Sequence, residues 1–421
     1  MRSPHGSRRT RASACCSSRP GHRTPSRRST SRWLSVSDTR SDHELSRAWI
    51  EAAVDAGLPA NPDFNGPRQD GVGFYQLTQR NGMRCSAAVA YLHPALARPN
   101  LTLVHSAPVT RLLFERERAT GVEVVRDGIV QALHAEREVV LCAGAYNTPQ
   151  LLMLSGIGPA DHLREHGLDV RLDQPAVGSN LSDHVNAGLI VRTETESLMT
   201  AETEANVALL RAHGRGPLTS NIAEVGGFWR SRDGLDAPDV QFHVAPVMFA
   251  EQGLAPPSEH AWSAGACVLT PEGRGEVRLR SADPTAKPRI VTRWLDGGRD
   301  WAAMLAAQRL LLEIAARPAI ARHGTDPFQA PASDADADLR AHVRSVAHCL
   351  YHPVGTCALG TVVDSELRVR GIDGLRVADA SVMPTVPRGN TNAPAIMIGE
   401  KAADLLAGRT LEAAEAARIA A

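Results

Sequence analysis

The chain is poor in lysine, in aromatic residues and in long apolar runs, and each shortage narrows its range of functions. Only two of its 46 basic residues are lysine, and 46 acidic residues balance them to a formal net charge of zero. A balanced charge gives no general reason to expect nucleic acid as a partner. No uncharged apolar run approaches the roughly eighteen residues that span a bilayer, so we expect no integral membrane segment.

Several motifs of other protein classes are also missing. The seven cysteines contain no C-x-x-C pair, which favours reduced thiols over a disulfide framework. There is no G-x-S-x-G elbow of a serine hydrolase and no phosphate-binding P-loop. A complete G-x-G-x-x-G dinucleotide fingerprint is absent too, because residues 71–76 and 156–161 each begin one and lack the third glycine.

One short motif indicates zinc. His162 to His166 reads H-L-R-E-H, the pattern of some zinc peptidases, and two histidines at i and i+4 share one face of a helix. The alternative is an amphipathic turn that ends at Gly167 and packs its leucines inward. We favour the turn, expect no metal, and keep a zinc hydrolase that uses His162 and His166 as an alternative.

The amino-acid composition of the chain changes after residue 33. Residues 1–33 are rich in arginine and serine and contain no acidic residue, so we expect a disordered tail rather than a transit peptide. Residues 43–60 have the apolar spacing of a helix that stops at Gly57 and Pro59. Residues 61–85 are polar and glycine-rich, which is typical of a functional or covering loop.

Strands and helices are expected in two modules. Residues 101–143 indicate a β-meander with a turn at Gly121 and a hairpin at Asp127-Gly128. A short apolar helix follows and breaks at Gly156. The second module begins near Val170, with strands in 239–247, 266–271 and 275–281 and a long helix over 300–317.

The segment from Gly374 to Leu406 is the most informative. A strand ends at Val377, and small residues follow that let backbone N–H groups approach a ligand. Asn392 occupies the expected N-cap of the last helix, with Pro394 in its first turn. A helix N-terminus stabilises negative charge, which favours an anion or an electron-rich ring nearby. An ordinary cap without a ligand remains the alternative.

Separated segments of the chain together resemble the glucose–methanol–choline (GMC) family of FAD-dependent oxidoreductases, nearest to choline dehydrogenase and similar alcohol dehydrogenases. These segments are residues 64–96, "VVLCAGAYNTPQLLMLSGIGP" at 139–159, "AVGSNLSDH" at 176–184, "YHPVGTCALG" at 351–360, and 363–406. The likeness spans about residues 34–410.

The resemblance implies a mixed α/β fold, in which an incomplete Rossmann-like FAD-binding domain is interleaved with an antiparallel-sheet substrate domain. We expect the flavin domain in residues 34–165, the substrate domain in 166–349, a return to the flavin domain in 350–410, and a tail in 411–421. The implied cytoplasmic protein carries no membrane span, and peripheral membrane association is left open.

The resemblance also implies roles for single residues. His352 matches the histidine that accepts the substrate hydroxyl proton, and Asn392 matches the second active-site position. The residues implied to contact FAD are Val109, Ala143 and Gly144 at its adenosine portion, Asp379 and Ala380, and Asn390 and Thr391 near the flavin ring.

The implied reaction is oxidation of a primary alcohol to an aldehyde, with hydride transfer to FAD. The substrate would be choline-like or another small or medium alcohol, and oxygen, a quinone or another carrier would accept the electrons. An imidazole whose pKa is about 6.5 suits a base at neutral pH.

The chain departs from the family in one respect. The family's dinucleotide fingerprint lies ahead of every segment matched above, where this chain has the arginine-rich tail. We therefore expect an N-terminally truncated member that binds FAD weakly or not at all. The alternative to an enzyme is a non-catalytic remnant or binding module with part of the fold.

Overall fold

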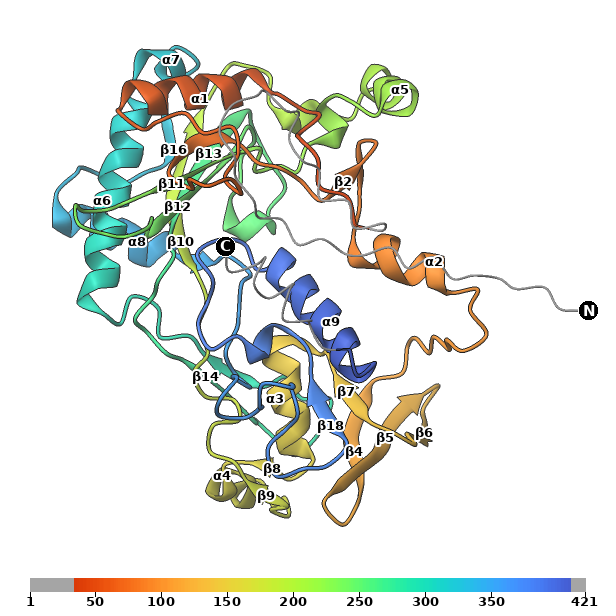
Figure 1. Ribbon diagram of the computed structural model, residues 1–421. Helices are drawn as coiled ribbons and strands as arrows, with labels where there is room; N and C mark the ends of the chain where they lie inside the picture. Colours follow the sequence, from red (N-terminus) through yellow and green to blue (C-terminus); the bar gives the residue numbers. More distant parts are fainter. Residues whose placement is uncertain (1–33, 410–421) are drawn as a thin grey trace, which may run out of the picture.

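The computed structural model describes residues 34–409 (Figure 1). Their buried side chains form two main hydrophobic cores. One core lies on a large antiparallel sheet, and the other surrounds a small parallel strand pair. The expected tails at residues 1–33 and 411–421 lie outside the described residues. The mixed α/β fold with an antiparallel sheet is confirmed.

The large sheet has seven strands in the order β1-β11-β12-β13-β10-β16, with β17 also paired to β10. The bounds of its strands are β1 (Gly71–Phe74), β10 (Val185–Arg192), β11 (Val225–Trp229), β12 (Val240–Ala245), β13 (Ala261–Val268), β16 (Pro327–Gln329) and β17 (His348–Cys349). All pairs are antiparallel. β12 pairs with β11 on one side and with β13 on the other, which places it in the sheet interior.

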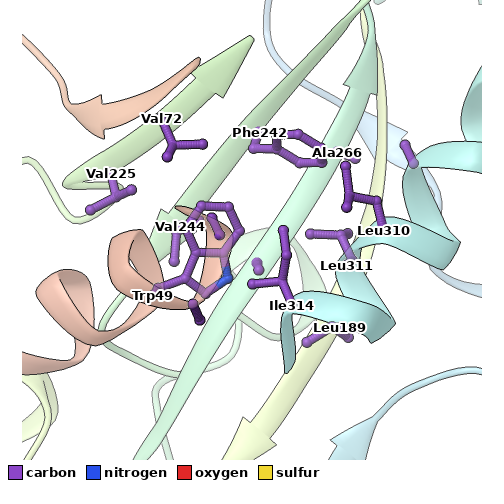
Figure 2. Close-up of a cluster of buried hydrophobic side chains, with 14 of the residues drawn as sticks. Trp49, Val72, Leu189, Val225, Phe242, Val244, Ala266, Leu310, Leu311 and Ile314 are labelled. Atoms are coloured by element: carbon purple, nitrogen blue, oxygen red, sulfur yellow. The ribbon is translucent and has the colours of Figure 1, made fainter. Parts of the chain in front are cut away.

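Helices cover one face of this sheet and bury its apolar side chains (Figures 1 and 2). They are α1 (Glu44–Asp55), α6 (Gly298–Ala315), α7 (Pro318–Ala321) and α8 (Asp336–Val346). The rings of Trp49 and Phe242, both fully buried, lie 6.1 Å apart. Burying side chains of this size contributes about 2–3 kcal/mol each. Because side chains alternate along a strand, Gln241 and His243 project from the opposite face.

The second core surrounds a parallel pair, β7 (Val139–Leu141) and β18 (Leu375–Val377). It is closed by α3 (Gly144–Leu154), the short helix η5 (Ala380–Val382) and α9 (Asn392–Leu406). A three-stranded antiparallel sheet lies beside it, formed by β4 (Val109–Glu115), β5 (Arg118–Arg126) and β6 (Ile129–His134).

The remaining elements are short and connect these layers. They are β2 (Gln79–Arg80), β3 (Met83–Arg84), η1 (Ala88–Leu92), α2 (His93–Ala95), β8 (Ile157–Gly158), α4 (Ala160–Glu165), β9 (Leu172–Asp173), η2 (Leu198–Thr200), α5 (Glu204–His213), η3 (Pro217–Thr219), η4 (Glu251–Gly253), β14 (Glu276–Arg278) and β15 (Arg289–Val291). The expected long loop at 61–85 thus contains three short strands, and one of them, β1, is an edge of the large sheet.

The meander was predicted correctly only in part. The hairpin at Asp127-Gly128 is confirmed, with φ of 52° and 77° at the two residues, as a two-residue turn between strands requires. The turn at Gly121 was wrong, because that residue lies inside β5, where a Cβ would meet the carbonyl oxygen of Leu133 at 2.2 Å. The last strand, β7, leaves the meander for the parallel pair with β18.

Both hydrophobic cores draw residues from either side of position 165. Both α1 and β1 precede that position, and both belong to the core of the large sheet. Leu279, by contrast, lies within the expected substrate domain and packs into the core around β7 and β18. The chain therefore crosses between the two cores several times.

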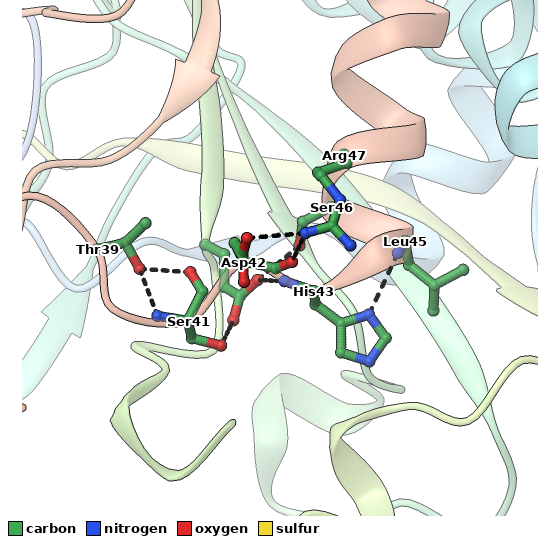
Figure 3. Close-up of polar contacts among 8 residues, drawn as sticks. Thr39, Ser41, Asp42, His43, Leu45, Ser46 and Arg47 are labelled. Atoms are coloured by element: carbon green, nitrogen blue, oxygen red, sulfur yellow. Dashed lines mark hydrogen bonds and ion pairs between the residues drawn. The ribbon is translucent and has the colours of Figure 1, made fainter. Parts of the chain in front are cut away.

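A buried carboxylate holds the start of α1 against the sheet. Glu224, directly before β11, is fully buried and accepts hydrogen bonds from Ser41 Oγ at 2.6 Å and Ser46 Oγ at 2.8 Å. It also accepts one from the backbone N–H of His43 at 3.2 Å. Figure 3 shows these three donors around the first turn of the helix. Hydrogen bonds to an ionised acceptor are the stronger kind, so this contact fixes where α1 begins.

Replacement of this carboxylate tests that role. We expect Glu224→Ala to lower the free energy of unfolding by about 3 kcal/mol, because buried hydroxyls lose their charged acceptor. Urea titration measures the change. Glu51→Ala removes an exposed carboxylate from the same helix and should shift stability by less than about 0.5 kcal/mol. Equal effects of the two substitutions would contradict the role assigned to Glu224.

Candidate active site

His352 lies in the loop after β17, at the junction between the two cores. The loop is held beside the segment that leads into β10, with Leu350 N donating to His184 O and Val354 N donating to Ser182 O, both at 2.9 Å. The backbone N–H of His352 donates to Asp183 Oδ1 at 2.9 Å. His352 itself is 7% exposed, so its ring is fixed in a nearly dry setting.

The ring of His352 touches polar groups from both sides of the junction. Its Nδ1 lies 3.0 Å from Nδ1 of His184, and the two rings are nearly perpendicular at 89°. Its Nε2 lies 3.4 Å from Nδ2 of Asn390, in the turn before α9. His184 is fully buried and places its own Nε2 3.3 Å from the carbonyl oxygen of Leu269.

These contacts determine which nitrogen of His352 carries the proton. A carbonyl oxygen only accepts, so His184 Nε2 carries a hydrogen and the Nδ1 of neutral His184 must accept. His352 Nδ1 is then the donor to His184. Neutral His352 therefore keeps a lone pair on Nε2, the atom that faces Asn390.

Burial keeps both histidines uncharged at neutral pH. Desolvation lowers the pKa of His352 to about 4. Desolvation also lowers the pKa of His184, with charge repulsion from His352 as the second cause. At pH 7 the Nε2 of His352 is therefore unprotonated and carries a lone pair, although burial makes it a weaker base than the pKa of about 6.5 expected from the sequence.

Asp183 holds the backbone of the loop that contains His352. Burial raises the pKa of this carboxyl to about 6, against the opposing effect of hydrogen bonds from the backbones of His352 and His184. Its Oδ2 is buried without a hydrogen-bond partner within residues 34–409. The Asp183 contact acts on the backbone of His352 and leaves the imidazole free for chemistry.

The sheet adds a second polar group to the site. Gln241 Nε2 donates to Tyr75 Oη at 2.8 Å and to Asn390 Oδ1 at 3.0 Å. Tyr75 stacks on His243, with ring centroids 5.6 Å apart and an interplanar angle of 29°. Burial lowers the pKa of His243 to about 3, so this ring is also neutral. The polar face of β12 thus connects to His352 through Asn390.

The structure distinguishes between the two asparagines before and at the start of α9. Thr391 is the N-cap, and Asn392 is the first helical residue, so the predicted cap at Asn392 was displaced by one position. Asn392 is exposed, whereas Asn390 contacts both His352 and Gln241. Asn390 therefore occupies the place beside His352 that we expected of Asn392.

The expected flavin contacts gather at the carboxyl ends of β7 and β18. Asp379 Oδ2 accepts from Gly144 N at 2.9 Å and Thr148 Oγ1 at 2.6 Å, and Oδ1 accepts from Ser381 N at 2.8 Å. Asp379 thus ties the start of α3 to the turn after β18. Ala143 and Ala380 flank these bonded residues in the chain. Val109 is 41% exposed at the start of β4, and none of these contacts reaches it.

The geometry at these strand ends fits a flavin dinucleotide. The N-cap residues of α3 and α9 make no side-chain hydrogen bond to the first turn, although Asp379 occupies the N–H of Gly144. The other N–H groups of these first turns are therefore available to an anionic or electron-rich ligand. A Cβ at Gly144, where φ is 81°, would meet only open space. In open α/β sheets, ligands bind outside the carboxyl ends of the parallel strands, which is where these groups lie.

The zinc alternative has no support in the geometry. His162 Nε2 accepts a hydrogen bond from the backbone N–H of Leu279 at 3.0 Å. The rings of His162 and His166 pack edge to face, with centroids 4.7 Å apart. Among residues 34–409, no three His, Cys, Asp or Glu side chains form a group that could hold a metal ion.

Known proteins share both the sequence and the fold. Two family models described as GMC oxidoreductase match residues 14–186 and 271–399. An uncharacterised GMC-type oxidoreductase of Mycobacterium tuberculosis is 46% identical over 89% of this chain and 72% of its own length. The chain belongs to the GMC oxidoreductase family. GMC oxidoreductases use FAD.

Other relatives carry named activities. An alcohol dehydrogenase [acceptor] of Pseudomonas putida is 40% identical over 89% of this chain and 70% of its own length. An oxygen-dependent choline dehydrogenase of Brucella suis is 39% identical over 90% and 71%. Among solved structures, formate oxidase is similar with a TM-score of 0.80 at 26% identity, covering 88% of this chain and 72% of that one.

The resemblance predicted from sequence motifs is thereby confirmed at the level of the family. Sequence reasoning missed Gln241, Tyr75 and His243, although the alternation in residues 239–247 could have placed Gln241 and His243 on one face. Asp183 and His184 end the segment "AVGSNLSDH", and the resemblance implied no separate role for either. Within residues 34–409, no helix is long and apolar enough to cross a membrane.

The buried neutral histidines predict acid sensitivity. A lowered folded-state pKa adds stability above pH 6.5, and this stability is lost as the pH falls towards the folded value. We expect the decline in unfolding free energy between pH 7 and 4.5 to be smaller in His184→Asn than in wild type by about 2 kcal/mol. Thr356→Val, a buried non-titrating control, should keep the wild-type decline. Parallel curves for His184→Asn and wild type would contradict the prediction.

Proposed function

We propose that this GMC oxidoreductase oxidises a primary alcohol to the aldehyde, with Nε2 of His352 as the base. The observation that carries the proposal is the pairing at the junction of the two cores. There, the lone pair of His352 Nε2 lies beside the amide donor of Asn390. One acceptor and one donor at a single point match the needs of an alcohol that becomes an alkoxide.

The chain's own residues would handle the proton and the oxygen. His352 takes the hydroxyl proton at Nε2 and becomes an imidazolium that still donates from Nδ1 to His184. Asn390 Nδ2 donates to the substrate oxygen as negative charge develops there. Bound FAD would supply the acceptor for the hydride that leaves the alcohol carbon. The alcohol thus loses one proton and one hydride and becomes the aldehyde.

The residues that would hold FAD come from the strand ends and helix starts. We assign to this role Ala143, Gly144, Asp379, Ala380, Asn390 and Thr391, with Val109 as a more distant contact. Asp379 already orders the backbone of Gly144 and Ser381, so its part is to shape the turn. An electron acceptor, oxygen or a quinone or another carrier, would then reoxidise the cofactor.

Three tryptophans that could hold the trimethylammonium group of choline lie away from the polar face of the sheet. A trimethylammonium group is best held by aromatic faces and a carboxylate. Trp262 lies in the core beneath the helices, and Trp294 and Trp301 pack against that core, so none of them belongs to the polar face of the sheet. Asp183 accepts a hydrogen bond from the His352 backbone through Oδ1 alone.

Substitution of His352 tests the proposal, with activity measured in excess FAD over a panel of primary alcohols. We expect His352→Gln to reduce kcat/KM at least about 100-fold, because a positioned base contributes that much. In wild type, kcat/KM should fall as the pH drops through about 4, since only neutral His352 accepts a proton. His162→Gln, distant from the junction, should keep wild-type turnover. Unchanged activity in His352→Gln would remove the assignment.

A non-catalytic remnant remains the second candidate, because the sequence contains no G-x-G-x-x-G fingerprint. That turn supplies the N–H groups that bind the pyrophosphate of a dinucleotide. We expect this polypeptide to bind FAD weakly, with flavin lost during gel filtration. Absorbance of the purified chain measures the flavin content, and stoichiometric yellow flavin would contradict this expectation.

A further inference from the structure

Gln241 is a buried amide with an unusual set of partners. It lies on β12 in the sheet interior and is fully buried. Its one Nε2 serves two acceptors, Tyr75 Oη and Asn390 Oδ1. Its Oε1 is buried and has no hydrogen-bond partner in the described part of the chain. A buried acceptor without a partner is costly, so the donor side of this amide must hold the geometry.

The orientation of the Gln241 amide follows from its neighbour Tyr75. The phenol has one hydrogen, and it donates that hydrogen to the carbonyl oxygen of Phe242 at 2.7 Å. Tyr75 Oη can then only accept from Gln241, which requires the NH2 group on that side. The same NH2 group meets Asn390, so Asn390 presents its oxygen to Gln241 and its Nδ2 to His352.

The hydrogen bonds on the His184 side of His352 require the same orientation of the Asn390 amide. The Leu269 carbonyl fixes His184 as an acceptor at Nδ1, and this leaves His352 Nε2 with a lone pair. The Phe242 carbonyl thus determines, through Tyr75 and Gln241, which group of Asn390 faces His352. The Leu269 carbonyl determines, through His184, which nitrogen of His352 has the lone pair. Both carbonyls require a donor on Asn390 and an acceptor on His352.

We propose that Gln241 is a positioning residue that fixes the amide of Asn390, so that its NH2 group and not its carbonyl faces His352 and the substrate oxygen. Asn390 is otherwise exposed in the turn before α9, and its amide could rotate. A rotated amide would bring two acceptors together and leave the alkoxide without a donor. The catalytic consequence rests on the proposed function, whereas the amide orientation does not.

Two substitutions of Gln241 test this role. Gln241→Met removes the donor at similar volume, and Gln241→Glu replaces it with an acceptor at pH 8. In Gln241→Glu, Asn390 turns its NH2 group towards the carboxylate, so its Oδ1 faces the lone pair of His352 Nε2. That repulsion is relieved when His352 moves its hydrogen to Nε2 and His184 moves its own to Nδ1, with loss of the weaker contact to Leu269 O. We expect kcat/KM to fall about 10-fold in Gln241→Met and about 100-fold in Gln241→Glu.

A measurement that does not depend on catalytic turnover distinguishes a positioning role from a general loss of stability. ¹⁵N NMR of the histidine-labelled protein without FAD reports the tautomer, with the signals of His352 assigned from the His352→Gln spectrum. Wild type should protonate Nδ1, and Gln241→Glu should protonate Nε2. The matched control is Gln308→Leu, which removes another buried glutamine amide, one that donates to Ala187 O from α6. It should lower stability and keep both the tautomer and kcat/KM.

The outcomes decide between the two proposals. The wild-type tautomer and wild-type kcat/KM in both Gln241 variants would overturn the positioning role. A tautomer change in Gln241→Glu, together with no turnover of any alcohol by wild type, would support the positioning role and reject the proposed function. Equal losses in Gln308→Leu and the Gln241 variants would show that Gln241 acts only through stability.

Discussion

The hydrogen bond between Nδ1 of His352 and Nδ1 of His184 connects the two ends of the polar system at the centre of the molecule. Two imidazoles can share such a bond only while at least one nitrogen is unprotonated. Burial of both rings keeps them neutral, and the Leu269 carbonyl decides which of them donates. The chemistry available at His352 therefore depends on the backbone carbonyl of Leu269, which contacts His184 and not His352.

The large sheet can carry these polar contacts because one of its faces is apolar and packs against helices, whereas the other face carries polar side chains. One face of β12 contributes Phe242 and Val244 to the core beneath α1 and α6. The other face carries Gln241 and His243 towards Tyr75 and Asn390. The rigid apolar face holds the strand in place, so a single glutamine amide can orient a residue in an exposed turn. Stability and positioning thus come from alternate residues of one strand.

The second core contributes the carboxyl ends of a parallel strand pair and two helix starts without side-chain caps. Asp379 organises this edge through backbone and hydroxyl donors on both sides. The loop containing His352 and the turn containing Asn390 meet between this edge and the sheet. Membership of the GMC family brings FAD chemistry to this chain, and we propose that this edge holds the cofactor because of its arrangement of donors.

The sequence by itself determined the family, the mixed fold class and the helix at 43–60, because long local motifs and residue periodicity carry that information. It did not determine which asparagine meets His352, since Asn390 and Asn392 are two residues apart and only the start of α9 separates their directions. It also missed Gln241, whose partners lie 166 and 149 positions away in the chain. Contacts of that range depend on how two cores are packed together, and only the tertiary structure decided them.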